Sequence, residues 1–129
     1  MPILTVNLSP ENSLTVIRGA SKTLDMTITD TDTGRAADLT GGRIVLTVKE
    51  SVTDARPVIQ KISDEATQAE ITLPRSGIAR IYLVPADTQN LTLKDYVFDV
   101  WVILASGKRY HVIQPSVFTI QPGVTLQAL

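Results

Sequence analysis

One set of side chains in this sequence has the types required for hydrolytic chemistry. His111 is the only histidine, and with Asp99 and Ser116 it could supply the base, the orienting acid and the nucleophile of a triad. No nucleophile-elbow motif surrounds the serine, and no second cluster of titratable residues supports it. A single histidine on a strand beside a tryptophan is more typical of a packing or interface residue. We therefore expect no catalytic residues and no enzyme.

Two other segments resemble ligand-binding motifs. Asp30-Thr31-Asp32-Thr33-Gly34 is similar to the opening of a calcium loop, but the position that needs a bidentate carboxylate is Gly41, and no helices flank the segment. We expect a hairpin turn there instead. Gly41-Gly42 precedes a strand pattern rather than a helix start, so it does not form a phosphate cradle. Cysteine is absent, which excludes disulfides, thiolate catalysis and cysteine-based zinc sites. No metal and no cofactor are expected.

In the segments that would position any site, apolar and polar residues alternate with a period of two, which is typical of β-strands. The clearest case runs from Tyr96 to Tyr110 as two alternating segments joined by Ala105-Ser106-Gly107. A three-residue loop keeps the apolar side chains of both strands on one face, and Gly107 supplies the left-handed conformation that such loops use. The predicted pairs are Val102 with Tyr110, Val100 with Val112, Trp101 with His111 and Ile103 with Arg109.

This register predicts an unusually apolar outer face on the hairpin, with Trp101 outside the core. A contiguous apolar patch indicates either an interaction surface or a region covered by another segment, such as a terminal arm of the same chain. The extended, uncharged C-terminus is a second candidate interaction element. The candidate interaction surface therefore comprises Val97, Trp101, Ile103, His111, Ile113, Val124, Leu126 and Leu129.

Similar alternating segments, separated by turn residues every eight to twelve positions, continue along most of the chain. They predict an all-β fold: a single immunoglobulin-like antiparallel β-sandwich of roughly seven to nine strands. Tyr96, with a leucine a few residues before it, is similar to the tyrosine corner of Greek-key sandwiches. Pro57 predicts that the short strand after it lies at a sheet edge. We expect an N-terminal extended arm over residues 1–12, the sandwich over 13–121 and a C-terminal tail over 122–129.

Composition narrows the possible partners. The 12 basic and 13 acidic residues nearly cancel, so no overall field favours nucleic acid or an anionic membrane. No apolar segment approaches the length of a membrane span. The first residues lack the basic flank and apolar stretch of a signal peptide, which predicts synthesis in the cytoplasm.

Several motifs, in order, resemble one protein family. The first half of the chain contains Leu24-Asp25-Met26-Thr27-Ile28-Thr29-Asp30, Gly34 and Asp38-Leu39-Thr40-Gly41. The second half contains Tyr96-x-Phe98-Asp99-Val100, Ser106-Gly107-Lys108 and Phe118-Thr119-Ile120-x-Pro122-Gly123-Val124-Thr125. This order resembles the N-terminal immunoglobulin-like domain of baseplate upper proteins from tailed phages, and similar small virion proteins. The similarity covers about residues 14–125. It implies a structural protein of a virion, made in the host cytoplasm, in a tail, baseplate or neck.

The expected function is therefore non-enzymatic assembly, with other phage virion proteins as partners and a homo-oligomer in the particle. Nucleic acid and membrane are not expected partners. The alternative is a carbohydrate- or receptor-binding module in which Trp101 and Tyr82 are stacking platforms for sugar rings. In the Asp38-Leu39-Thr40-Gly41 segment, Leu39 should close one end of the sandwich, and Asp38 or Thr40 should bond nearby backbone N–H groups.

Overall fold

The alternating segments form strands over nearly the whole chain. The computed structural model describes residues 4–7, 13–30 and 34–122, and these contain ten strands and two short helical turns. The count exceeds the expected seven to nine because residues 4–7 form a strand of their own and a two-residue strand follows the 30–34 turn. The elements are β1 Leu4–Asn7, β2 Ser13–Ile17, β3 Lys22–Asp30, β4 Arg35–Ala36, β5 Arg43–Lys49, β6 Ile59–Ile62, β7 Ala69–Leu73, η1 Pro74–Ser76, β8 Ile78–Leu83, α1 Pro85–Thr88, β9 Asp95–Ile103 and β10 Arg109–Gln121.

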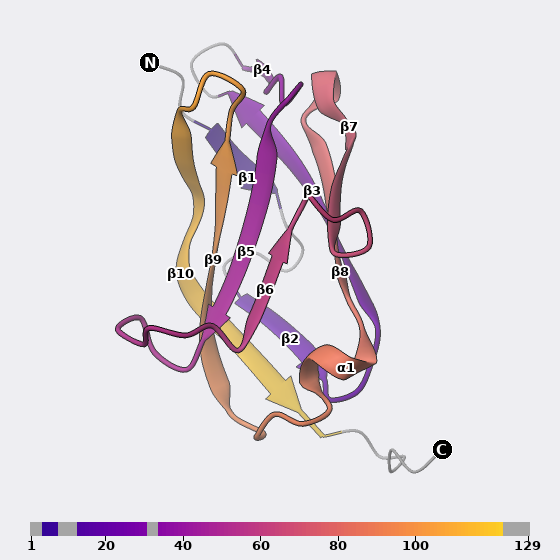
Figure 1. Cartoon of the computed structure of the whole chain (residues 1–129), viewed down its shortest axis with the longest axis vertical. Coiled ribbons are helices and arrows are strands. Elements are labelled where there is room, and N and C mark those ends of the chain that lie inside the picture. The colour runs from indigo at the N-terminus through magenta and orange to yellow at the C-terminus, as the bar shows by residue number, and fades with distance from the viewer. Residues whose placement is uncertain (1–3, 8–12, 31–33, 123–129) are drawn as a thin grey trace.

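The strands lie in two sheets that face each other (Figure 1). The first sheet, sheet A, has the order β1-β3-β8-β7, with β4 also paired to β3. The second, sheet B, has the order β2-β10-β9-β5-β6, in which β2 runs parallel to β10 and the other pairs are antiparallel. This arrangement corresponds to the ABED and CFG sheets of an immunoglobulin fold, with β6 as the extra strand that variable-type domains add. The predicted fold class is confirmed.

The core lies between the sheets and follows the predicted alternation. In β3, Leu24, Met26 and Ile28 are buried while the residues between them face outward. Phe98 of β9 and Phe118 of β10 meet at the centre, with ring centroids 6.1 Å apart and planes at 69°, an edge-to-face contact. The chain has no cysteine, so this apolar packing replaces the disulfide that often joins the sheets of secreted immunoglobulin domains.

The β9–β10 hairpin confirms part of the predicted register and corrects the rest. Gly107 is left-handed (φ 88°), and Trp101 lies opposite His111, so the three-residue loop and the outward position of Trp101 are confirmed. Beyond His111, however, Val100 pairs with Ile113 and not with Val112. A β-bulge inserts one extra residue at this point and reverses the parity at Ile113, and a second irregularity between Ile113 and Ser116 restores it. The expectation that Ile113 lies on the outer face is therefore wrong: the residue is only 8% exposed and belongs to the core.

The turn between α1 and β9 contains the predicted tyrosine corner. The Tyr96 hydroxyl donates a hydrogen bond to the Thr92 carbonyl oxygen at 2.9 Å, and the ring is buried. The Lys94 ammonium lies 5.1 Å from the centre of the same ring. Together these contacts hold the loop against the end of sheet B at which β9 begins.

The opposite end of the sandwich is closed by the segment before β5. Leu39 is buried, and the Asp38 carboxylate accepts hydrogen bonds from the Thr40 amide (3.0 Å) and hydroxyl (2.6 Å). The Thr40 hydroxyl, and then its amide, lower the pKa of Asp38. Both expectations for this segment are confirmed. The Gly34 amide bonds the Asp30 carbonyl where β3 turns back into β4, as expected for a hairpin turn.

Both edges of the sandwich are held by contacts with neighbouring elements. Residues 4–7, within the predicted N-terminal arm, pair antiparallel with β3 and so extend sheet A. Pro57 does precede an edge strand, because β6 is the last strand of sheet B. Lys61 of β6 is buried and pairs with Asp87 of α1 at 2.8 Å, which ties this edge to the connection after β8. Neither helical turn in the described residues is long enough to cross a membrane.

Candidate interaction surface

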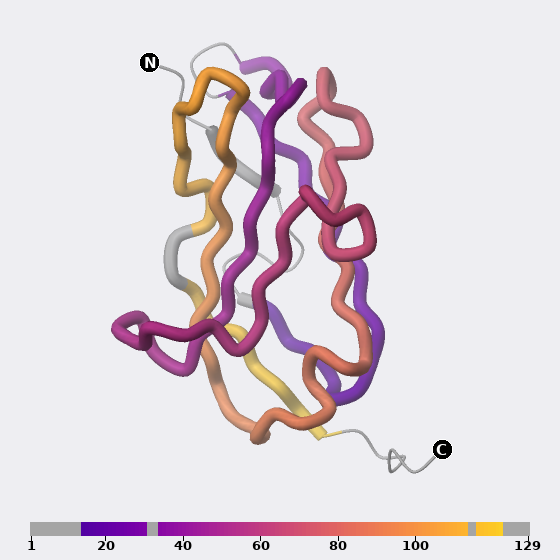
Figure 2. Tube along the Cα trace, viewed as in Figure 1, coloured from indigo at the N-terminus to yellow at the C-terminus, as the bar shows by residue number. Residues whose placement is uncertain are grey.

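The outer face of sheet B collects large apolar side chains from three neighbouring strands. Figure 2 shows the chain path through β5, β9 and β10, which lie side by side in this sheet. Exposed Trp101 stands near the centre, and exposed Val117 lies further along β10 (37% and 44% exposed). We call this surface the Trp101 face; it comprises Val45, Thr47, Lys49, Val97, Asp99, Trp101, Ile103, Arg109, His111 and Val117.

A hydrogen-bonded cluster fixes the orientation of Trp101. Its indole ring stacks on the His111 imidazole from the adjacent strand, with centroids 4.5 Å apart and planes at 18°. One oxygen of Asp99, Oδ2, is 3.0 Å from His111 Nε2 and also accepts a hydrogen bond from Trp101 Nε1 at 3.3 Å. The shared carboxylate holds both rings in one arrangement. A large aromatic side chain that is already ordered loses little conformational entropy when a partner covers it.

The cluster contains two members of the triad that the sequence allows on paper, but not the third. Ser116 lies opposite Phe98 in the β9–β10 ladder, whereas His111 lies opposite Trp101. Residues directly opposite in an antiparallel pair point to the same side of the sheet. Phe98 is buried in the core, so Ser116 belongs to the inward side and Asp99 and His111 to the outward side. These three side chains do not converge as a nucleophile, a base and an acid must.

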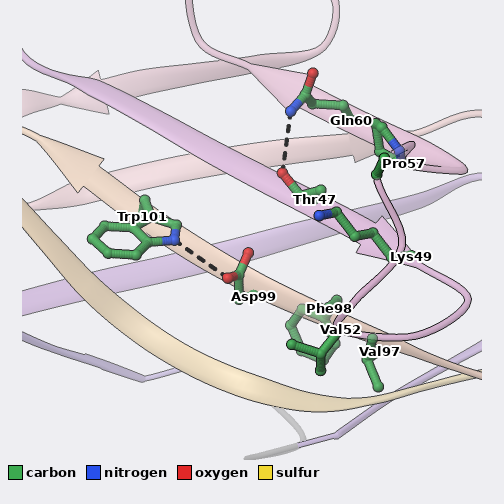
Figure 3. Close-up of a pocket in the computed structure, with 10 residues that line it drawn as sticks. Thr47, Lys49, Val52, Pro57, Gln60, Val97, Phe98, Asp99 and Trp101 are labelled. Carbon is green, nitrogen blue, oxygen red and sulfur yellow. Dashed lines mark hydrogen bonds between the residues drawn. The ribbon is translucent and has the colours of Figure 1, made fainter.

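A hollow of about 310 Å³ borders the Trp101 face on the β6 side (Figure 3). The segment between β5 and β6 forms its far wall, and Gln60 Nε2 donates to Thr47 Oγ1 at 3.3 Å across its floor. Sequence reasoning missed this wall, since the segment from Ser51 to Arg56 is mostly polar; exposed Val52 within it is the clearest signal. The hollow is lined by Thr47, Lys49, Val52, Ala55, Pro57, Gln60, Val97, Phe98, Asp99 and Trp101.

The predicted surface residues are thus only partly brought together. Trp101, Val97, Ile103 and His111 share the outer face of sheet B, while Ile113 lies in the core. Val124, Leu126 and Leu129 lie outside the described residues, as does most of the predicted tail. Val45 and Val117 were missed because the other outward-facing residues of their own strands are mostly polar, and only the strand pairing places them beside the apolar residues of β9.

The outer face of sheet A is polar by comparison. Arg80 pairs with Asp25 at 2.8 Å, and the Tyr82 hydroxyl donates to Glu70 at 2.5 Å. The hydrogen bond to Glu70 raises the pKa of Tyr82. Because Tyr82 and Trp101 lie on opposite sheets, they cannot stack on one sugar ligand as a single platform. In the described residues, no three His, Asp or Glu side chains come close enough to hold a metal ion; residues 31–33 of the calcium-like segment are not among them.

Comparison with known proteins supports the fold. No family model and no curated protein sequence match the chain. Among solved structures, the chain is similar to CopC from Methylosinus trichosporium OB3b, with a TM-score of 0.52 and 16% identity over 98% of this chain and 99% of that one. It is also similar to the GspB Siglec domain, with a TM-score of 0.55 and 18% identity over 98% of this chain. The chain spans 61% of the length of that second structure. These likenesses show an immunoglobulin-like β-sandwich and nothing finer.

Proposed function

We propose that the protein is a non-enzymatic docking module that joins subunits of a larger assembly through the Trp101 face. The observation that carries this proposal is an exposed tryptophan, held rigid by Asp99 and His111, within a strip of apolar side chains. Tryptophan, tyrosine and arginine dominate the binding energy of protein interfaces, and they do so when they are pre-ordered and surrounded by a polar rim. Among the residues whose side chains are described, the outer face of sheet A offers no such strip.

The kind of assembly follows from the sequence motifs. Their order is similar to that of baseplate upper proteins, so we propose a structural component of a tailed-phage virion, in the tail, baseplate or neck. Repeated copies of such a subunit make a homo-oligomer in the particle the natural arrangement. The C-terminal residues 122–129 are proposed as a second docking element. Deleting them should reduce incorporation into particles; unchanged incorporation would exclude that role.

The experiment uses the phage or prophage that encodes the chain. Purified particles are probed with an antibody to the protein, after the gene has been deleted and supplied again as wild type, as Trp101→Ala or as Tyr82→Ala. The last variant is the matched control, an aromatic truncation on the outer face of the opposite sheet. We expect wild type and Tyr82→Ala in particles and much less Trp101→Ala. Absence of the wild-type protein from particles would contradict the virion assignment, and equal incorporation of both variants would contradict docking through this face.

A glycan-binding module is the second candidate, and the hollow beside Trp101 favours it. Thr47, Gln60 and Asp99 place polar atoms near the indole, as sugar-binding sites do. Against it, one ring face of Trp101 is already covered by His111. Quenching of the Trp101 fluorescence separates the two candidates. Protection by glycans supports sugar binding, whereas protection only on oligomerisation supports assembly.

A further inference from the structure

Trp101 separates two hollows on the same face. The first, of about 310 Å³, opens toward β6, and the second, of about 230 Å³, opens toward the tip of the β9–β10 hairpin. Trp101 lines both of them. The second is otherwise lined by Val45, Ile103 and Arg109. A partner that covers the indole would therefore extend side chains into a hollow on each side.

Each hollow holds one cation that forms no ion pair within the described residues: Lys49 in the first and Arg109 in the second. The Trp101 face carries one carboxylate, Asp99, which is hydrogen-bonded to His111 and Trp101. With histidine counted as neutral, Lys49, Arg109 and Asp99 give this face a formal charge of +1, although the net charge of the whole chain is −1.

The pairing register sets the spacing of the two cations. Lys49 lies opposite Val97 and Arg109 lies opposite Ile103, so the two are six positions apart along β9, on strands that flank it. At about 3.3 Å per residue and about 4.8 Å between strands, their Cα atoms are about 22 Å apart. An extended peptide covers this distance with roughly seven residues. Trp101 lies between the two ends of that path.

We propose that the Trp101 face binds an extended acidic segment of a partner subunit. Carboxylates near the two ends of the segment pair with Lys49 and Arg109, and an apolar side chain between them packs on Trp101. Charge complementarity selects the segment, while burial of the apolar side chain supplies most of the affinity. The inference rests on the proposed docking function and names the chemistry of the surface that docks.

A synthetic probe tests the chemistry directly. The probe is a blocked heptapeptide with glutamate at both ends, leucine in the middle and threonine elsewhere; the comparison peptides carry glutamine or lysine at the ends. The chain contains one tryptophan, so fluorescence reports Trp101 alone. We expect the acidic probe to bind with a Kd on the order of 1 mM or below, and to bind more weakly as salt is added. Binding of the glutamine probe with equal affinity, or no response to the acidic probe, would overturn the inference.

Protein variants locate the contact. Lys49→Gln/Arg109→Gln should weaken the acidic probe at least about tenfold, because both charge pairs are lost. The control variant, Lys22→Glu/Arg75→Glu, reverses two charges away from this face and should leave binding unchanged. Equal weakening by both double variants would show a non-specific charge effect and overturn the inference.

The particle assay distinguishes this inference from the docking function itself. If Trp101→Ala is lost from particles while Lys49→Gln/Arg109→Gln is retained, docking stands and the acidic partner is wrong. If Trp101→Ala is retained, the docking function fails whatever the peptides do. Loss of both variants, with the control retained, supports the two proposals together.

Discussion

Removal of the same hydroxyl group at two tyrosines should have opposite consequences for stability. Tyr96 donates its hydrogen bond to the Thr92 carbonyl oxygen at 2.9 Å. The Tyr110 hydroxyl is also buried, but it has no hydrogen-bond partner in the described part of the chain. Tyr96→Phe removes a bond that the fold uses, whereas Tyr110→Phe removes a polar atom whose burial is not compensated. The pair is matched, because the atoms deleted and the ring retained are identical.

The expected magnitudes follow from these contacts. A net intramolecular hydrogen bond contributes about 0.5–1.5 kcal/mol, so Tyr96→Phe should cost about 1 kcal/mol. Tyr110→Phe should change stability by about 0.5 kcal/mol or less, in the stabilising direction, since burial of an unpaired hydroxyl is itself unfavourable. With about 2.1 cal/mol/K of unfolding entropy per residue, 129 residues give about 0.27 kcal/mol/K, so 1 kcal/mol lowers Tm by about 4 °C.

The measurement is thermal and urea unfolding followed by circular dichroism, with wild type and both variants at the same pH and salt. The m-values should agree, which shows that the unfolded states are comparable. The reasoning is refuted if Tyr110→Phe destabilises the protein as much as Tyr96→Phe does. That result would mean that the Tyr110 hydroxyl also makes a stabilising contact. A Tyr96→Phe variant as stable as wild type would mean that the tyrosine corner contributes nothing beyond its ring.

Three further substitutions test other contacts. Lys61→Met leaves Asp87 without its partner in a nearly buried position and should cost about 2–4 kcal/mol by urea unfolding, somewhat less than a fully buried pair because Asp87 keeps 17% of its side-chain exposure. Gly77→Ala should cost well over about 1 kcal/mol, because Gly77 is left-handed (φ 67°) and a Cβ atom there would collide with the Ile28 carbonyl oxygen. Thr40→Val should raise the pKa of Asp38 toward its ordinary value in an NMR titration, because the hydroxyl that stabilises the carboxylate is removed.

The first two of these substitutions have their own controls. Lys61→Met combined with Asp87→Asn should recover most of the lost stability, and no recovery would show that the ion pair is not the cause. Gly34→Ala tests backbone strain alone, because Gly34 is also left-handed but nothing lies within 4 Å of its Cβ position; an equal cost at Gly77 would exclude the collision.

The Asp38 prediction also has a definite sign for stability. A carboxylate whose folded pKa is lowered stabilises the protein above its unfolded pKa, near 3.8, and this contribution is lost as pH falls through the folded value. Thr40→Val should therefore reduce the loss of stability on acidification. An unchanged acid limb of the stability curve would contradict the role of the Thr40 hydroxyl.

Much of the fold could be predicted from the sequence because strand parity is a local property. Alternation of apolar and polar side chains placed Phe98 inside and Trp101 outside, and Gly107 predicted the hairpin loop. The corner at Tyr96 and the edge position after Pro57 likewise depend on a few neighbouring residues. Each of these features depends on residues that are close together in the sequence, so the pattern of residue types is sufficient to predict it.

Other features depend on which strands pair, and only the tertiary structure decided those. The bulge after His111 buries Ile113, and no local pattern marks where a ladder gains an extra residue, since either register gives similar backbone hydrogen bonding. The same holds for residues 4–7, which join sheet A, and for Lys61, whose partner Asp87 comes from a distant turn. The Trp101 face itself arises because three separate strands bring their outward residues side by side: the sequence determined the parity of each strand, and long-range pairing determined the surface that they form together.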